Sequence, residues 1–330
     1  MKHLVRRYGA GLFFLGLIAA AGMPGASAAE KVMDYFRYDT LPSDVQGEYI
    51  QYVKIDLNAA WNRLKVSTQD AQLCGQGDLP SPSMSVLQNT QPANPQNCSV
   101  TNYTWWQKAG RPFANVRFVV NANFFKIDPP NPYKNQCGKG LGVAINDRAW
   151  VSGQNLDDRL VHGDVTNTLI IYNEAGSAAN GGAKATIVDQ SYKFEQNKDH
   201  IQAAISGYRF MTDGAFVPVT SEAFPNHYKP RTAVGLSQDG RYLTFLSINP
   251  GYRSHGATLQ EADHFYQALV AKGARNALYL DGGGSATLVL KNQQGNTLLS
   301  TLPSDVRDVD GKPDCSKRFY RPAPVVFGVR

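Results

Sequence analysis

The sequence predicts a strand-rich α+β fold, a single domain with a mixed β-sheet and a few helices. Three observations favour this class. Many short segments carry the apolar, β-branched and alternating patterns of strands, Asp- and Gly-containing turns separate them, and one segment has a clear helical period. Strands that greatly outnumber helices are typical of α+β domains.

The N-terminal residues resemble a secretory signal. Residues 1–28 place Lys2, Arg6 and Arg7 before an uncharged apolar run, and Ala26-Ser27-Ala28 suits a signal-peptidase cut. The apolar run is shorter than the roughly 20 residues that span a bilayer. We therefore expect 1–28 to be removed, 29–46 to form an N-terminal extension, 47–330 to form the functional domain, and the mature chain to be periplasmic or secreted, with no membrane span.

The charge gives no reason to expect a nucleic-acid partner. The formal net charge of +6 falls to +3 once the three basic residues of 1–28 are removed, and no long basic run remains. The sequence carries no signal for an oligomeric state.

Strand patterns occupy the first half of the domain. YIQYVKIDL (49–57) alternates like a strand, and RLKVST (63–68) is expected to pair with it. NVRFVVNANFF (115–125) resembles a buried strand with a polar tip. LGVAI (141–145) and AWVSG (149–153) indicate a hairpin, and TLIIY (168–172) and ATIVD (185–189) are two strands joined by a Gly/Ala-rich loop.

The second half adds a hairpin, a helix and further strands. RTAVGLS and RYLTFLSI flank Gln238-Asp239-Gly240, a strong hairpin signal. Thr258 and Glu261 have capping-box spacing, and Gly273 supplies a helix stop. One face of this helix is expected to be apolar; its residues are Leu259, Ala262, Phe265, Tyr266, Leu269 and Val270. NALYLD, SATLVL and TLLST follow as strands, the last two joined by a turn at 292–296.

The motif YLDGGGSATLVL (279–290) joins two of these strands through three glycines. It has neither the Gly-Lys-Ser/Thr of a P-loop nor the GxGxxG spacing of a dinucleotide fold. A tight turn would explain glycine through positive φ. Three glycines also expose backbone amides, which can hold an anionic or polyhydroxylated group beside Asp281.

Four cysteines in an exported chain indicate two disulfides, and three pairings are open. We favour Cys74–Cys98, because the Pro-rich polar segment between them gains from closure, which leaves Cys137–Cys315. A zinc site is not expected, since the sequence lacks CxxC spacing and its histidines are scattered.

Five segments in order resemble the phosphodiester glycosidase family, which has many exported bacterial members. ALYLDGGGSATLVL resembles its signature, and the likeness extends over about 47–330. VVNANFF, PRTAVGL, SHGATLQEA and RPAPVVFGV resemble its N-G-G-F-F tip, R-T-A-I-G strand, G-M-T-L-x-E helix start and closing R-x-V-P-N-A-L-G-V segment. Asn123 replaces a usual Gly, Val325 a usual Asn, and NPGYRSHG is a loose match with Asn249 in place of an acid.

The resemblance implies hydrolysis of the glycosidic C–O bond of a sugar-1-phosphodiester, GlcNAc-phosphodiester-like, with release of free sugar and a phosphate monoester. Asp281 would be the carboxylate that activates water, attacks the sugar or stabilises the oxocarbenium. Arg231 would hold the phosphate, and Glu261 is a third catalytic candidate. The substrate-binding candidates are Asn121, Thr232, His255, Gly282, Gly283, Gly284, Ser285 and Arg321.

Each candidate also has a structural explanation. Asp281 could cap its turn, Arg231 could lie on a strand surface, and Glu261 could serve only the capping box. Asn121 could cap its strand, Arg321 could pack, and a lone loop histidine such as His255 is more often solvated.

Two other functions remain open at this point. One is a non-catalytic protein that binds an envelope glycan or exopolysaccharide. The other is a metal-dependent phosphodiesterase, which would need clustered His and Asp ligands that the sequence does not show. We therefore expect no metal or other cofactor, and a sugar phosphodiester or envelope glycan as the partner.

Overall fold

The computed structural model describes residues 30–42, 49–66, 79–80, 116–126, 137–155, 160–161, 164–219, 231–249, 262–301, 305–309, 312–319 and 325–330. Most of these belong to one compact unit, Lys31–Arg330, which is separate from Met1–Glu30. The expected signal segment, 1–28, lies outside the described residues. Among the helices that the structure describes, none has the length and apolar character needed to cross a membrane.

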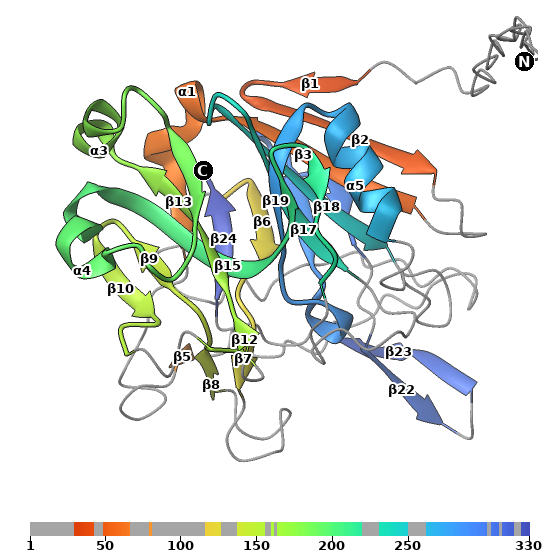
Figure 1. The fold of residues 1–330 in the computed structure, drawn as a ribbon. Coiled ribbons are helices and arrows are strands. Elements are labelled where there is room, and N and C mark those ends of the chain that lie inside the picture. The colour runs from red at the N-terminus through yellow and green to blue at the C-terminus, as the bar shows by residue number, and fades with distance from the viewer. Residues whose placement is uncertain are drawn as a thin grey trace, which may run out of the picture. The chain divides into compact units, whose positions relative to one another are not determined.

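A 12-stranded sheet forms the larger layer of this unit (Figure 1). Its main path runs in the order β1 (Lys31–Met33), β2 (Phe36–Pro42), β3 (Tyr49–Asp56), β18 (Tyr242–Asn249), β17 (Thr232–Ser237), β19 (Ala274–Tyr279), β15 (Ile201–Thr212), β13 (Asn167–Tyr172) and β14 (Ala185–Val188). The hairpin of β9 (Ala144–Asn146) and β10 (Ala149–Ser152) joins it through β15, as does β16 (Ala215–Phe216).

A second, 5-stranded sheet lies against the first. Its order is β21 (Thr297–Ser300), β20 (Leu288–Lys291), β6 (Phe118–Asn121), β24 (Val326–Val329) and β4 (Leu64–Val66). Smaller pairings join β11 (Leu160–Val161) to β12 (Asp164–Val165), β22 (Asp305–Val309) to β23 (Lys312–Phe319), and β8 (Cys137–Gly140) to both β5 (Leu79–Pro80) and β7 (Phe125–Lys126).

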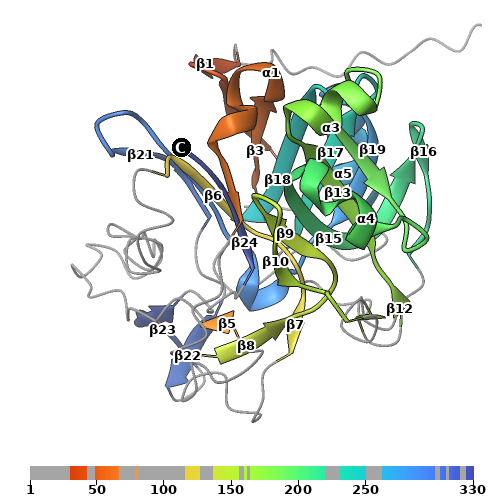
Figure 2. The ribbon, with the colours of Figure 1, turned by 90° about the vertical axis from the view of Figure 1, so that its left-hand side faces the viewer.

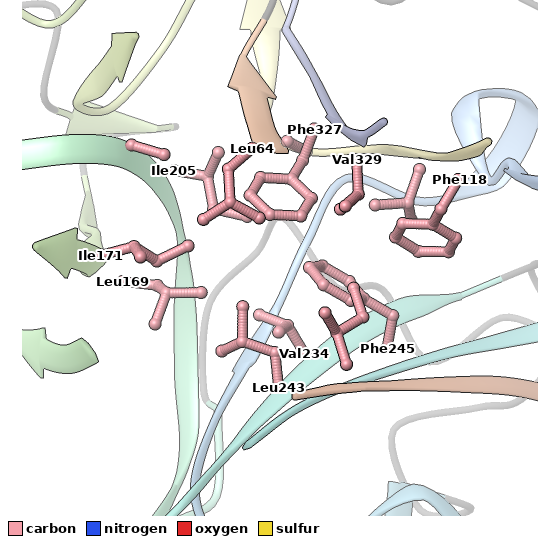
Figure 3. Packing of buried hydrophobic residues seen from close by; sticks show 14 of the residues in the cluster. Leu64, Phe118, Leu169, Ile171, Ile205, Val234, Leu243, Phe245, Phe327 and Val329 are labelled. Carbon is pink, nitrogen blue, oxygen red and sulfur yellow. The ribbon is translucent and has the colours of Figure 1, made fainter. Parts of the chain in front are cut away.

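The main hydrophobic core fills the space between the two sheets. Figure 3 shows side chains of β24, β4 and β6 facing those of β17, β18, β13 and β15. Phe245 of the large sheet stacks on Phe327 of the small one, with ring centroids 5.1 Å apart, and Phe118 approaches Phe245 to 5.3 Å. Burial of this apolar surface is the main stabilising contribution of the fold.

One helix of three turns covers the other face of the large sheet. α5 (Ala262–Ala271) packs beside β18 and β19 and buries Leu269 in a second apolar cluster (Figure 1). A Cβ at Gly235 of β17 would lie 2.7 Å from Leu269 Cδ2, so this close approach requires glycine. The helix ends at Ala271, and Gly273 two residues later has φ +85°, as expected for a glycine that stops a helix. Val270 is 41% exposed, so its expected place on the apolar face is wrong.

The remaining helices are single turns or little more. They are α1 (Leu57–Ala60), the 3-10 turn η1 (Trp61–Arg63), α3 (Glu174–Ala179), α4 (Phe194–Asn197), and the 3-10 turns η4 (Lys198–His200) and η5 (Gly283–Ser285). Figure 2 shows α3 and α4 in front of strands of the large sheet, and α3 contacts β13. The expected fold class, strand-rich α+β with few helices, is confirmed. Every strand pair among the described residues is antiparallel, and no parallel pair is seen there.

The local hairpins agree with the sequence. The β9–β10 turn has positive φ at Asp147 and Arg148, and the β17–β18 turn has Gly240 at φ +67°. Positive φ at two consecutive residues is the mark of a type I′ turn, which matches the twist of the strands.

The structure differs from these expectations in three places. β4 pairs with β24 and not with β3, so the pairing expected for 63–68 is wrong. β1 pairs with β2 and β2 with β3 at the edge of the large sheet, so residues 31–42 of the expected N-terminal extension take part in its pairing; the division of the chain at residue 47 stays a prediction. The expected Gly/Ala loop between β13 and β14 contains the helix α3.

Candidate functional site

Three motifs that are far apart in the sequence meet where strands of the two sheets end. The Leu280 amide donates to the Thr232 carbonyl at 2.9 Å and so extends the pairing of β17 with β19. The Asp281 amide donates to the Ala122 carbonyl, 3.0 Å away, just beyond β6 of the second sheet. NANFF, RTAVG and DGGGS therefore converge, as expected; the helix start at Thr258 lies outside the described residues.

Asn121 is the centre of this junction. Its side chain is fully buried, and its Nδ2 donates to the Asp281 carbonyl at 2.6 Å. Its Oδ1 accepts from the Thr232 hydroxyl at 3.0 Å and from the Thr287 amide at 2.9 Å. One amide thus ties together the ends of three strands and the turn that carries Asp281. Its direct binding of sugar stays a prediction; the geometry shows a positioning residue.

Thr232 serves the same junction. Its side chain has no exposed surface, and its hydroxyl is hydrogen-bonded to Asn121. Direct contact of Thr232 with substrate likewise stays a prediction.

The glycines after Asp281 form a single 3-10 turn, η5, rather than an extended phosphate cradle. The Gly282 amide donates to Asp281 Oδ1 at 2.9 Å, and the Ser285 amide donates to the Gly282 carbonyl at 3.2 Å. The Gly282 amide is therefore used within the turn and is not bare, and substrate binding by Gly282, Gly283 and Gly284 stays a prediction. Gly283 has φ +60°, a conformation that favours glycine, and no atom lies within 4 Å of a Cβ built there.

Arg231 is buried beside the same strand end, with 6% of its surface exposed. The alternative explanation, that Arg231 is an exposed arginine on a strand surface, is therefore wrong. Burial lowers the pKa of Arg231 below its usual value, while the nearby Tyr279 and Asp281 act in the opposite direction. A guanidinium and a carboxylate from neighbouring strands therefore interact electrostatically at this junction.

Tyr279 is a member of this site that sequence reasoning missed. It is buried at the end of β19, and its ring stacks on Phe210 with centroids 3.8 Å apart. The signal was present in the sequence, because residues two apart on a strand lie on the same face and Tyr279 is two residues before Asp281.

Ser285 ends the turn with a buried hydroxyl. The residue is 1% exposed, and its Oγ has no hydrogen-bond partner within the described residues. A buried hydroxyl without a partner is costly, so this group is suited to a ligand or a water molecule. Its role as a substrate contact stays a prediction.

The departures at Asn123 and Val325 have structural reasons. Asn123 Nδ2 donates to the carbonyls of Leu141 and Val143, and its Oδ1 accepts from the Ser206 amide at 2.8 Å. Val325 is fully buried in the core between the sheets. Both side chains hold the fold of this chain.

Several expected site residues lie outside the described residues: Glu261, His255 and Arg321. The side chains of Cys74, Cys98, Cys137 and Cys315 are not described either, so both disulfides stay predictions. Within the described ranges, no group of three or more His, Cys, Asp and Glu side chains is placed to hold a metal ion. The expectation of a metal-free, cofactor-free site also stays a prediction.

The model of the phosphodiester glycosidase family matches residues 114–330, more than half of the chain. The chain belongs to the phosphodiester glycosidase family.

The chain resembles several solved structures. The chain is similar to the catalytic domain of zebrafish N-acetylglucosamine-1-phosphodiester alpha-N-acetylglucosaminidase, auto-inhibited by its pro-peptide, at 15% identity and TM-score 0.51, covering 89% of this chain and 82% of that one. A hypothetical protein from Synechocystis matches at 13% identity and TM-score 0.43, covering 89% and 62%. A candidate exported protein from Burkholderia pseudomallei matches at 14% and 0.41, covering 89% and 74%. No curated protein sequence matches the chain.

Proposed function

We propose that this protein hydrolyses the glycosidic C–O bond of a sugar-1-phosphodiester, with a GlcNAc-like sugar, to free sugar and a phosphate monoester. Family membership supports a phosphodiester glycosidase-type function. The observation that carries the finer proposal is that the buried Arg231 and Asp281 both stand at the paired ends of β17 and β19.

The chemistry needs little from a general acid. A phosphate monoester is already a weak base, so its departure from the anomeric carbon requires less protonation than the departure of an alcohol. What the reaction needs is a cation for the phosphate and a carboxylate for the sugar. In our proposal Arg231 binds the phosphate oxygens through its guanidinium fork. Burial strengthens that attraction, because the surroundings screen it less than water does.

Asp281 supplies the carboxylate in this proposal. Its main chain is held at both ends, by the Ala122 carbonyl and by the Asn121 amide, so the carboxylate starts from an anchored backbone. Anchoring of this kind aligns a reacting group before substrate binds, which lowers the entropic part of the barrier.

Isotope labelling tests which bond breaks. The protein is incubated with UDP-GlcNAc and other sugar-1-phosphodiesters in ¹⁸O water, and products are identified by mass spectrometry. Label in the released sugar supports C–O cleavage. Label in the phosphate would mean P–O cleavage and would reject the proposal, and saturable binding without turnover would favour the non-catalytic glycan-binding function.

One substitution tests the role of Asp281. Asp281→Asn keeps the size and most of the turn hydrogen bonding but removes the charge, so turnover should fall at least ~10²-fold. The melting temperature should change little, because a turn aspartate contributes on the order of 1 kcal/mol or less.

The matched control is Asp239→Asn in the turn between β17 and β18, at the far end of β17 from Arg231. Asp239 accepts hydrogen bonds from Ser237 and from the Arg241 amide. This variant should keep wild-type turnover. Wild-type turnover in Asp281→Asn would remove Asp281 from the catalytic site.

We also propose that the chain is exported to the periplasm or beyond. The support is the signal-like sequence of 1–28. N-terminal sequencing of the protein recovered from outside the cytoplasm should begin near Ala29; a chain that keeps Met1 and stays in the cytoplasm would reject export.

A further inference from the structure

A hollow of about 500 Å³ lies away from the Asp281 junction, where β15 begins. Its walls come from η1, the β9–β10 turn, the start of α3 and the second residue of β15. The side chains that define its chemistry are Trp61, Asp147, Arg148, Asn173, Glu174 and Gln202. Asp147, Arg148 and Glu174 are exposed, so the hollow is open to solvent and a ligand would lie on it rather than be enclosed.

The walls are held in place by backbone hydrogen bonds. The amides of Asp147 and Arg148 donate to the carbonyls of Gln202 and Ile201 at 2.7 and 3.1 Å, and positive φ fixes both turn residues in a tight hairpin. A Cβ at Gly176 would lie 2.2 Å from the His200 carbonyl oxygen, so α3 approaches the start of β15 as closely as glycine allows. The hollow is thus formed by rigid elements and not by one loop.

The chemistry of the walls fits a sugar ring. Trp61 is half-buried and offers an aromatic surface, over which Lys184 Nζ lies 5.7 Å from the ring centroid. Pyranose rings have apolar C–H faces that pack on such a surface. The hydroxyl groups of a sugar can form hydrogen bonds with polar side chains of the hollow, such as Asp147, Glu174 and Gln202.

The charges favour a neutral ligand. Asp147 and Glu174 supply two negative charges, and Arg148 and Lys184 supply two positive ones. Arg148 Nε is 3.5 Å from Asp147 Oδ1, so part of this charge is already paired. A phosphate would meet two carboxylates here, in contrast to the site at Arg231.

We propose that this hollow, the Trp61 hollow, is a second carbohydrate-binding site that takes one unit of a neutral oligosaccharide. Gln202 at the hollow and Tyr208, which pairs with Tyr279 beside Asp281, lie on the same strand. They are six residues apart, which is about 20 Å at the rise of an extended strand. A chain of several sugar units is long enough to span this distance.

Binding of phosphate-free probes tests the proposal independently of catalysis. Isothermal titration calorimetry with N-acetylchitotetraose and with cellotetraose should show saturable binding of at least one, at roughly millimolar Kd or tighter. Trp61→Ala should weaken it at least tenfold, Trp61→Phe less, and Glu174→Gln at least threefold.

Two controls locate the binding. Glu195→Gln changes an exposed glutamate on the neighbouring short helix α4 and should bind as the wild type does. Asp281→Asn should also keep the binding, and Trp61→Ala should keep the hydrolysis of a small sugar phosphodiester. Because the probes carry no phosphodiester, loss of the proposed catalytic function would not affect this test.

Three results would overturn the proposal. The first is that neither probe gives a saturable heat of binding. The second is that the Trp61 and Glu174 variants bind the probe with the same affinity as the wild type. The third is that Asp281→Asn loses the binding while Trp61→Ala keeps it. The last would place the oligosaccharide at the Asp281 junction instead.

Discussion

Asn121 shows how much a single side chain decides in this protein. It lies at the end of a buried strand of the small sheet, yet its three hydrogen bonds all reach groups that are distant in the sequence. The arrangement uses both Nδ2 and Oδ1, which a leucine or alanine could not replace. The position of Asp281 therefore depends on a residue 160 positions earlier in the chain.

Asn121→Ala should destabilise the fold by ~2–4 kcal/mol, because it leaves the Asp281 carbonyl, the Thr232 hydroxyl and the Thr287 amide buried without this partner. Urea unfolding measures the loss. The control is Asn58→Ala, an exposed asparagine of α1, which should stay within ~0.5 kcal/mol of the wild type. Equal stability of Asn121→Ala and the wild type would mean that the junction does not depend on this amide.

Among the elements, the packing of α5 on the large sheet depends on Gly235. A Cβ there would lie 2.7 Å from both Leu269 Cδ2 and Ala274 Cβ. Real side chains essentially never come this close, so the helix or the strand must shift. A glycine inside a strand is otherwise unfavourable, which indicates that it is used here for close approach.

Gly235→Ala should therefore cost ~1–3 kcal/mol, the usual range for overpacking. A double-mutant cycle with Leu269→Ala measures the coupling: the paired variant should be less destabilised than the sum of the two single variants. Strict additivity would show that Leu269 does not transmit the clash.

The start of β18 and the end of β3 are joined by an ion pair. Arg241 donates from Nε and Nη2 to the two carboxylate oxygens of Asp56, at 3.0 and 2.6 Å. Asp56 also caps α1 by accepting from the Asn58 amide. The hydrogen bond from Arg241 is the largest cause that lowers the pKa of Asp56 below its usual value. The ionised carboxylate therefore stabilises the fold.

Folding lowers the pKa of Asp56, so its ionised carboxylate adds to the free energy of unfolding at pH values above the unfolded pKa near 4. This contribution is lost as the pH falls through the folded pKa. Asp56→Asn keeps a good cap but removes the charge. The variant should be ~0.5–1 kcal/mol less stable near pH 7, a small value because the pair is partly exposed and screened by salt. Chemical unfolding at pH 7 and below pH 3 checks this: the difference should vanish at the lower pH, and a difference that is constant with pH would contradict it.

In the molecule as a whole, two sheets share one core, and the cysteines are expected to add covalent links outside it. Cys137 belongs to β8 and Cys315 to β23, and both strands stand outside the two main sheets. A disulfide stabilises chiefly by restricting the unfolded chain, and more so for a longer loop. Closure at Cys137–Cys315 would therefore matter more than closure at Cys74–Cys98.

Thiol titration of the exported protein, unfolded but not reduced, should find no reactive thiol. Two or more reactive thiols would contradict the two expected disulfides. Peptide mapping of the unreduced protein distinguishes the three pairings, and Cys74–Cys98 with Cys137–Cys315 is the pattern we expect.

The local elements could be predicted from the sequence alone. The β9–β10 and β17–β18 hairpins, the stop at Gly273 and the strand before DGGGS depend on neighbours in the chain, and their turn residues are visible in it. The family and three of the converging motifs were also visible, because each motif is a short run of residues.

Only the tertiary structure decided which strands pair and which side chains meet. The alternation of apolar and polar residues predicts a strand at 64–66, but it does not indicate whether β3 or β24 is its partner. β15 lies inside the large sheet and is buried along nearly its whole length, yet its sequence mixes apolar residues with Gln, Ser, Gly and Arg, and sequence reasoning did not assign it as a strand. The burial of Arg231 and the three hydrogen bonds of Asn121 depend on contacts between distant segments. Such contacts form only when the sheets pack, because their hydrogen bonds and apolar surfaces become favourable together and not one segment at a time.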